Sequence, residues 1–229
     1  MAVDGADVID VGGESTRPGA APVDEREELR RVVPVIEALA GEGLVVSSDT
    51  RRPAVMRAAI AAGAAMINDV GALAAEGTLD AVRETNAAVC LVHMQGEPGT
   101  MQNAPRYGDV VGEVRAFLAE RGRACEAAGI ARERIVVDPG FGFGKTLAHN
   151  LQLLRALPEI AALGYPVLAG LSRKSSLGTL TGRPVHERMP ASLAAALAAV
   201  SRGASIVRVH DVRETVDALK VWFAIQQSG

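Results

Sequence analysis

Polar and charged residues follow seven short apolar runs of the sequence. They stand in the segments DVGGESTRPG, SSDT, MINDVG, LVHMQG, VVDPGFGFGK, GLSRKSS and VRVHD. A single Asp at such a place can simply cap the helix that follows it. Capping alone is a poor explanation for polar residues at every one of these ends. They predict a shared binding site if the fold brings them together.

Three of these segments carry groups that suit the edge of a flat heterocycle. Asp49 and Asp138 offer carboxylates and Asn68 offers an amide, so together they can accept hydrogen bonds from a ring and donate them to it. Lys174 adds a cation that can bond a ring carbonyl or nitrogen. These four residues predict a heterocycle site.

A second group of residues suits an anion such as phosphate. Its members are Thr16, Arg17, Arg208 and His210. Guanidinium groups match phosphate oxygens in a bidentate geometry. We therefore expect one site that binds a heterocycle in one half and an anion in the other.

Two other patterns are weaker. The segment GFGFGKT resembles a nucleotide-binding loop, but the stretch from Gly140 to Gly144 is one residue too short for that motif. The histidines show no spacing typical of zinc ligands, and His93 can equally be a core or rim residue. Neither a triphosphate loop nor a zinc site is predicted.

The apolar runs themselves predict strands. They are rich in Val, Ile and Leu without polar alternation, which is typical of strands buried on both faces of a sheet. Five of them follow an Ala-rich helical pattern and a Gly, the residue that caps a helix in the left-handed conformation. The predicted strands are residues 6–11, 44–48, 66–70, 89–93, 135–138, 167–171 and 206–209.

Helical patterns separate these strands. Val110, Val114, Phe117 and Leu118 share one helix face, and Pro53 stands where a first helical turn tolerates proline. The Ala-rich stretch PASLAAALAAVSRG is expected to pack on the sheet rather than on a partner. A strand followed by a helix, repeated throughout, predicts a parallel sheet.

This pattern predicts an α/β fold in one domain over residues 1–229, an N-terminally truncated (β/α)8 TIM barrel with seven βα units visible. Gly5 resembles the other helix-to-strand junctions but follows only four residues. We therefore expect one strand and most of one helix to be absent before it. An open seven-stranded sheet is the structural alternative.

Composition limits the class of partner. The net charge of −3 and the pI near 5.9 favour no nucleic-acid partner. We expect no membrane span and no signal segment, hence a cytoplasmic protein, because no long apolar run occurs. Cys90 and Cys125 are far apart in sequence and are expected to be buried free thiols.

Seven motifs, in this order, resemble bacterial dihydropteroate synthase from about residue 5 to the C-terminus. They are GGESTRPG, SSDT, INDV, HMQGEPGTMQ, DPGFGFGK, GLSRKS and RVHD. The resemblance implies an enzyme of folate biosynthesis, a transferase that joins 6-hydroxymethyl-7,8-dihydropterin diphosphate to 4-aminobenzoate. The products are 7,8-dihydropteroate and diphosphate.

The resemblance also implies roles for individual residues. The pterin would contact Asp49, Asn68, Asp138, Gly170, Lys174 and Arg208. The diphosphate would contact Arg17, Arg208 and His210. The 4-aminobenzoate site, where sulfonamides also bind in this family, would be framed by Thr16, Arg17, Pro18, Phe143, Lys174 and Ser175. The residues implied to take part in catalysis are Asp138, Lys174, Arg208, His210 and Arg17.

The family further implies Mg²⁺ as cofactor and a homodimer formed through the later helices. Its magnesium-binding Asn belongs to a segment that has no counterpart in this sequence, so no metal ligand is predicted here. Two alternatives remain at this point. One is a non-catalytic pterin-binding homologue. The other is a folate-dependent corrinoid methyltransferase domain, which would need neither the aryl-amine residues nor a diphosphate subsite.

Overall fold

Strand-then-helix units repeat along the computed structural model, which describes residues 1–15 and 21–227. The strands are β1 (Ile9–Gly12), β2 (Val46–Asp49), β3 (Met66–Asp69), β4 (Ala88–Val92), β5 (Ile135–Asp138), β6 (Leu168–Ala169) and β7 (Ile206–Val207). The helices are α1 (Glu25–Gly41), α2 (Pro53–Ala61), α3 (Thr78–Val82), α4 (Val110–Ala127), α5 (Leu147–Arg155), α6 (Leu157–Ala161), α7 (Ser175–Thr181), α8 (Met189–Val200) and α9 (Val212–Gln226). Three short 3₁₀ turns complete the order: η1 (Ala2–Asp4), η2 (Arg132–Arg134) and η3 (Val185–Glu187).

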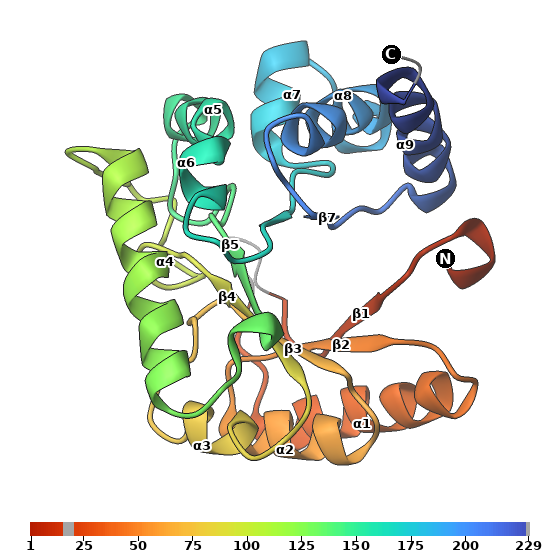
Figure 1. Ribbon diagram of the computed structural model, residues 1–229, viewed down its shortest axis with the longest axis vertical. Coiled ribbons are helices and arrows are strands. Elements are labelled where there is room, and N and C mark those ends of the chain that lie inside the picture. The colour runs from red at the N-terminus through yellow and green to blue at the C-terminus, as the bar shows by residue number, and fades with distance from the viewer. Residues whose placement is uncertain (16–20, 228–229) are drawn as a thin grey trace.

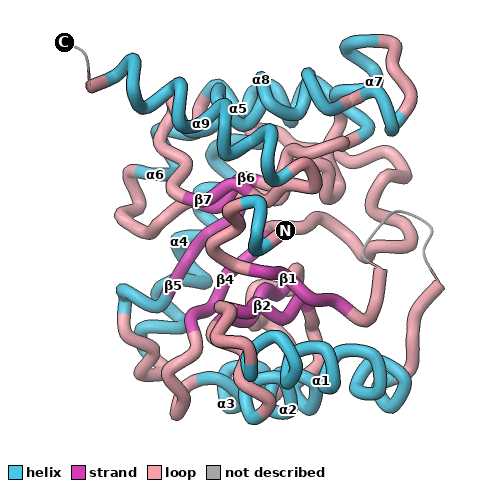
Figure 2. The backbone as a smooth tube through the Cα atoms, turned by 90° about the vertical axis from the view of Figure 1, so that its right-hand side faces the viewer, coloured by secondary structure: helices cyan, strands magenta, loops and turns pink. Residues whose placement is uncertain are grey.

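All strand pairs are parallel and follow the order of the sequence. β1 to β5 form one sheet, β6 pairs with β7, and a single bridge between Val137 and Val167 joins the two groups. The helices lie outside the strands, with α1–α3, α4–α6 and α7–α9 on three sides (Figure 1). From the side, the strands form a central layer between α1–α3 and α7–α9 (Figure 2). This is the α/β barrel arrangement that the sequence predicts.

Local signals set the helix ends. The Asp24 side chain caps α1 by accepting from the backbone N–H of Glu27, and Thr146 forms a capping box with His149 at α5. Pro53 opens α2 as predicted. The glycines of the five predicted junctions all have positive φ: Gly43, Gly63, Gly129, Gly164 and Gly203.

Two apolar layers hold the barrel together. Inside it lie eight buried residues: Met66, Val70, Cys90, Val92, Met101, Val136, Phe143 and Leu168. A larger cluster fills the space between the strands and the helices and includes Ile36, Ile67, Leu91, Leu118 and Leu153. Both cysteines are buried free thiols, as expected, with Cys90 in the inner layer and Cys125 in the outer one. The Ala-rich helix α8 contacts β7, also as expected.

Strand burial differs from the prediction at the two outer strands. Every residue of β2, β3 and β5 is buried, but β1 alternates between half-buried and exposed residues and β7 is half-buried. The expectation of burial on both faces is therefore wrong for β7, and β1, expected to be a buried strand, is partly exposed as well. Within the described residues each of these strands pairs with a neighbour on one side only.

The ends of several strands also differ from the prediction. β6 and β7 stop at Ala169 and Val207, two residues earlier than expected. The chain leaves the sheet there, and the residues that follow, starting at Gly170 and Arg208, form loops at the carboxyl end of the barrel. Among the described helices, none is both long enough and apolar enough to cross a bilayer.

Candidate active site

The polar strand ends meet at one rim of the barrel. In the strand register, Asp49 pairs with Gly12 on one side and with Asn68 on the other, and Val92 pairs with Asp138. Because parallel strands place their carboxyl ends at the same edge, these side chains surround one mouth. The convergence predicted from the sequence is confirmed for Asp49, Asn68 and Asp138.

Arg208 joins this group from the segment after β7. Its guanidinium lies 3.2 Å from Asp49 Oδ2 and 3.3 Å from Asp10 Oδ2. Burial disfavours its charged form, but Asp10, Asp49 and Asp138 outweigh that effect and raise the pKa of Arg208. The guanidinium that was predicted to bind an anion is thus held among carboxylates.

Asn68 is buried and unsatisfied. Its side chain is 2% exposed, and neither its amide nitrogen nor its oxygen makes a hydrogen bond of normal geometry with a described residue, although the amide lies near enough to Asp49 to lower the pKa of that carboxyl. Leaving such a group unpaired costs about 1–3 kcal/mol. An unpaired amide at this rim points to a ligand that supplies both a donor and an acceptor.

Asp49 and Asp138, the two buried acidic residues of the mouth, are both costly to ionise. Burial raises the pKa of Asp49 to about 6; Arg208 opposes this rise and Asp10 adds to it. Burial also raises the pKa of Asp138, against the backbone N–H of Gly140 and the charge of Lys174. A ligand that donates N–H groups to these carboxylates replaces the water they have lost.

Gly170 keeps the space between Asp138 and Arg208 open. A Cβ built on Gly170 would lie 3.9 Å from Asp138 Oδ2 and 4.0 Å from Arg208 Cβ. The other oxygen, Asp138 Oδ1, accepts from the backbone N–H of Gly140 at 2.7 Å. One carboxylate oxygen is therefore fixed by the loop, while the other borders the space above Gly170.

Lys174 and Phe143 form a contact beside this space. The Lys174 ammonium lies 4.3 Å from the centroid of the Phe143 ring. Ser175 is exposed at the start of α7, directly after Lys174. Of the residues expected to frame an aryl amine, Phe143, Lys174 and Ser175 are thus placed by the structure. Thr16, Arg17 and Pro18 lie outside the described residues.

His210 lies at the same rim but has a local partner. Its Nδ1 lies 2.9 Å from the hydroxyl of Ser172, which also accepts from the His210 backbone N–H. Nearby, Arg173 adopts a positive φ of 56° and its Nε donates to Asp211 at 3.1 Å. These contacts tie the loop after β6 to the loop after β7.

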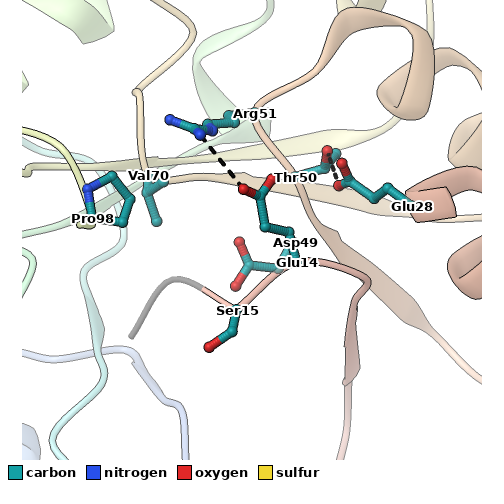
Figure 3. A pocket seen from close by; sticks show the side chains of 8 residues that line it. All are labelled: Glu14, Ser15, Glu28, Asp49, Thr50, Arg51, Val70 and Pro98. Carbon is teal, nitrogen blue, oxygen red and sulfur yellow. Dashed lines mark hydrogen bonds and ion pairs between the residues drawn. The ribbon is translucent and has the colours of Figure 1, made fainter. Parts of the chain in front are cut away.

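A small pocket lies beside Asp49 (Figure 3), next to a partly buried ionic network. Glu28 is 1% exposed and accepts from the Thr50 hydroxyl at 2.6 Å. Arg52 bridges Glu28 to Glu14, and Arg51 also pairs with Glu14. The network fixes Glu14 and Thr50 next to Asp49. The pocket is lined by Glu14, Ser15, Glu28, Asp49, Thr50, Arg51, Val70 and Pro98.

Sequence reasoning missed three residues of this region. Asp10 stands inside the apolar run of β1, where the alternation of side chains along a strand could have marked it as facing the mouth. Ser172 is close in sequence to Lys174 and was not singled out. Lys145 is the lysine of the segment that resembles a nucleotide loop, but its ammonium turns inward to His93, 2.9 Å away.

The described residues do not form a metal centre of protein ligands. No group of three or more His, Cys, Asp or Glu converges among them. Two carboxylates at the rim, Asp10 and Asp49, are both paired with Arg208.

Comparisons with known proteins are consistent with this geometry. A family model described as pterin binding enzyme matches residues 1–210. The chain is 54% identical over 228 residues to a dihydropteroate synthase of Neisseria meningitidis serogroup B, covering 97% of this chain and 80% of that protein.

Two solved structures resemble the whole chain. One is a Yersinia pestis dihydropteroate synthase in complex with a sulfonamide drug, with a TM-score of 0.97 and 48% identity, of which the match covers 83%. The other is a Burkholderia cenocepacia dihydropteroate synthase complexed with 7,8-dihydropteroate, with a TM-score of 0.94 and 56% identity, of which the match covers 84%.

Proposed function

The chain belongs to the pterin-binding enzymes and, within them, to the dihydropteroate synthase family, and from this premise we propose its reaction and the residues that perform it. The enzyme is a transferase that joins 6-hydroxymethyl-7,8-dihydropterin diphosphate to 4-aminobenzoate. It releases 7,8-dihydropteroate and diphosphate. The observation that carries this assignment is the unpaired Asn68 amide beside Asp49.

The pterin ring lies in the mouth of the barrel, with its donor and acceptor edge against the buried polar groups. The Asn68 side chain supplies both a hydrogen-bond donor and an acceptor, and the carboxylates accept hydrogen bonds from ring N–H groups. Gly170 leaves room for the ring to approach Asp138. The residues assigned to this subsite are Asp49, Asn68, Asp138, Gly170, Lys174 and Arg208.

The reaction breaks the C–O bond to diphosphate and forms a C–N bond to the aryl amine. Positive charge develops on the pterin as diphosphate departs, and the Asp138 carboxylate stabilises that charge. Arg17, Arg208 and His210 stabilise the negative charge on the departing oxygens. The weakly basic amine attacks without a strong general base, and its proton passes to water or to the departing diphosphate.

The 4-aminobenzoate subsite adjoins the contact between Phe143 and Lys174. The Phe143 ring offers an apolar face to the aryl ring, and Lys174 offers a cation near the carboxylate. Thr16, Arg17, Pro18 and Ser175 complete the assignment, although the first three lie outside the described residues. The complex of a related enzyme with a sulfonamide supports a drug-binding site in this family.

Magnesium is expected from the family, but the described residues do not fit a metal centre. We therefore assign no protein ligand to the ion and no catalytic step to it. The homodimer and the organisation of residues 1–229 as one domain also remain our proposals. The later helices, α7 to α9, are the surface at which we place the dimer contact.

Calorimetry combined with an assay of diphosphate release tests this function. Pterin diphosphate with magnesium is titrated into the full 229-residue chain, and 4-aminobenzoate is then added. We expect binding in the first step and release of diphosphate in the second. Binding without release would contradict the reaction and favour a non-catalytic pterin-binding protein. The absence of binding to folded protein would contradict the pocket.

A pair of variants tests the observation that carries the proposal. Asn68→Leu removes a buried amide that has no partner, so we expect pterin binding to weaken by about 100-fold or more while stability is kept. Thr78→Val is the matched control, because Thr78 is 0% exposed and its hydroxyl donates to the Ala75 carbonyl at 2.6 Å. That variant should lose stability and keep its pterin affinity. The reverse pattern would contradict the role of Asn68.

A further inference from the structure

Lys145 is a buried cation to which the proposed reaction gives no role. The residue is 3% exposed, and its Nζ lies 2.9 Å from His93 Nδ1. It also donates to the carbonyl oxygens of Gly140 and Phe143, each at 3.0 Å, and lies 3.3 Å from the His93 carbonyl oxygen. Its ammonium is thus surrounded by acceptors, as a desolvated charge requires.

The contact with His93 fixes how that ring is protonated. Burial, with a smaller contribution from Lys145, lowers the pKa of His93 to about 3, so the imidazole is neutral. When Lys145 is charged, its ammonium can only donate, so Nδ1 accepts and the ring proton stays on Nε2. The ring packs edge-on against Phe117, with 4.9 Å between the ring centroids. His93 is therefore a fixed acceptor at the end of β4.

The loop after β5 is built around this contact. Gly140 packs so closely on the end of β4 that an added Cβ would lie 1.8 Å from the His93 carbonyl oxygen. The Lys145 ammonium donates to the carbonyl oxygens of Gly140 and Phe143 within the loop. The Gly144 carbonyl accepts from the Tyr107 hydroxyl at 3.0 Å. Side chains from within the loop and from Tyr107 outside it, rather than sheet pairing, thus hold the conformation of residues 140–145.

Two residues of the proposed site depend on this loop. Phe143, whose carbonyl accepts from Lys145, carries the ring that lies beside the Lys174 ammonium. Gly140, whose carbonyl also accepts from Lys145, donates its N–H to Asp138 Oδ1. A displaced loop would therefore move the aryl-amine subsite directly, and the pterin subsite only through Asp138.

We propose that Lys145 is a positioning residue, whose ammonium locks the β5–α5 loop to His93 and thereby sets the Phe143 ring for 4-aminobenzoate. Burial lowers the pKa of Lys145 to about 7; the charge of Asp138 opposes this fall and that of Lys174 adds to it, so the ammonium form that makes these contacts predominates below about pH 7. The substrate effect rests on the proposed function. The contact between Lys145 and His93 does not.

Lys145→Met tests the proposal, because it keeps the length of the side chain and removes its donors and charge. We expect the KM for 4-aminobenzoate to rise by about tenfold or more, since small displacements of positioning groups have effects of this size. The KM for pterin diphosphate should change by less than about threefold. Lys145→Arg, which keeps charge and donors, should restore part of the loss.

Arg134→Met is the matched control. Arg134 also donates to buried backbone carbonyls, at 2.6 Å to Ala87 and 3.1 Å to Val82, but it lies at the opposite end of β5. We expect this variant to lose stability while both KM values stay within about twofold of the wild type. If Lys145→Met behaved like this control, with a loss of stability and both KM values unchanged, the positioning role would be overturned.

NMR of the imidazole nitrogens tests the contact without any substrate. In the wild type at pH 6, where Lys145 is charged and His93 neutral, long-range ¹H–¹⁵N spectra should show His93 protonated at Nε2 with Nδ1 as acceptor. Lys145→Met should shift the Nδ1 signal while Arg134→Met does not. A wild-type His93 protonated at Nδ1 would overturn the contact. Should Lys145→Met fail to fold, Lys145→Gln takes its place in every comparison. A wild type with this His93 signature that turned over neither substrate would contradict the proposed function alone.

Discussion

The guanidinium of Arg208 lies 3.2 Å from Asp49 Oδ2, although the two residues are 159 positions apart in the chain. The contact joins the segment after β7 to the end of β2. A second contact of the same guanidinium, to Asp10, reaches β1. Arg208 therefore links the first and last described strands, which do not pair with each other among residues 1–15 and 21–227.

Removing this link should destabilise the protein in a pH-dependent way. Arg208→Gln leaves Asp10 and Asp49 facing each other without a cation. Unpairing a fully buried charge costs about 3–5 kcal/mol. Because the Arg208 side chain is 37% exposed and solvent screens the pair, we expect the free energy of unfolding to fall by only about 1–2 kcal/mol at pH 8. The loss should be smaller at pH 5, where Asp49 is largely protonated. Urea denaturation at both pH values measures it.

Arg213→Gln is the control for that variant. Arg213 pairs with Asp4 at 2.9 Å, but its side chain is 73% exposed. Water screens such a pair, so we expect a smaller loss that hardly varies between pH 5 and pH 8. Equal losses for the two arginine variants would contradict the bridging role of Arg208.

The raised pKa of Asp49, about 6, predicts how pterin binding depends on pH. The folded protein holds this proton more tightly than the unfolded chain, so stability falls as the pH rises from about 4 to about 6. A pterin that donates N–H groups binds the ionised carboxylate, so its affinity should rise between pH 5 and pH 7. Asp138, whose pKa burial also raises, should act in the same direction.

Calorimetry at pH 5, 6, 7 and 8 measures this dependence, and buffers of different ionisation enthalpy measure the protons released on binding. We expect proton release below about pH 6 and little above pH 7. Asp49→Asn should weaken the pH dependence, and Asp138 should account for what remains. A flat affinity in the wild type would show that the ligand does not bind to an ionised Asp49.

The sequence predicted which residues meet at the rim better than how they pair. Asp49, Asn68 and Asp138 could be placed because parallel strands end at one edge, whatever their side chains do. The ion pair between Arg208 and Asp49 depends on side-chain directions across the barrel, which apolar periodicity does not encode. Lys145 was missed for a related reason: a Lys after a Gly-rich segment suggests a phosphate ligand, and only the packed loop shows the ammonium turned toward His93.

Gly170→Ala should separate binding from stability. The added methyl group would lie 3.9 Å from Asp138 Oδ2, an ordinary contact, so we expect stability to change by less than about 0.5 kcal/mol. The same methyl group occupies space assigned to the pterin ring, so affinity for pterin should fall by about tenfold or more. Thermal denaturation and calorimetry measure the two effects.

Gly41→Ala provides the comparison for that substitution. Gly41 ends α1, and a Cβ built there meets no atom within 4 Å. This variant should keep full pterin affinity and gain slightly in stability, because alanine restricts the unfolded chain. A Gly170→Ala protein that bound pterin as tightly as Gly41→Ala would contradict the position assigned to the ring.

The contact between Lys174 and Phe143 can be measured with a double-mutant cycle. The ammonium lies 4.3 Å from the ring centroid, within the range of a cation–π interaction, which contributes about 0.5–1 kcal/mol at exposed sites. Phe143→Leu, Lys174→Met and the double variant should therefore show a coupling of this size in the free energy of unfolding.

Substrate binding should reveal the same coupling. Phe143→Leu removes the aromatic face proposed to contact 4-aminobenzoate, and Lys174→Met removes the cation beside it, so either variant should raise the KM for 4-aminobenzoate. Because Lys174 is also assigned to the pterin, only Lys174→Met should raise the KM for pterin diphosphate. Additive unfolding energies would contradict the contact itself. A Phe143→Leu enzyme with an unchanged KM for 4-aminobenzoate would instead place the aryl ring elsewhere at the rim.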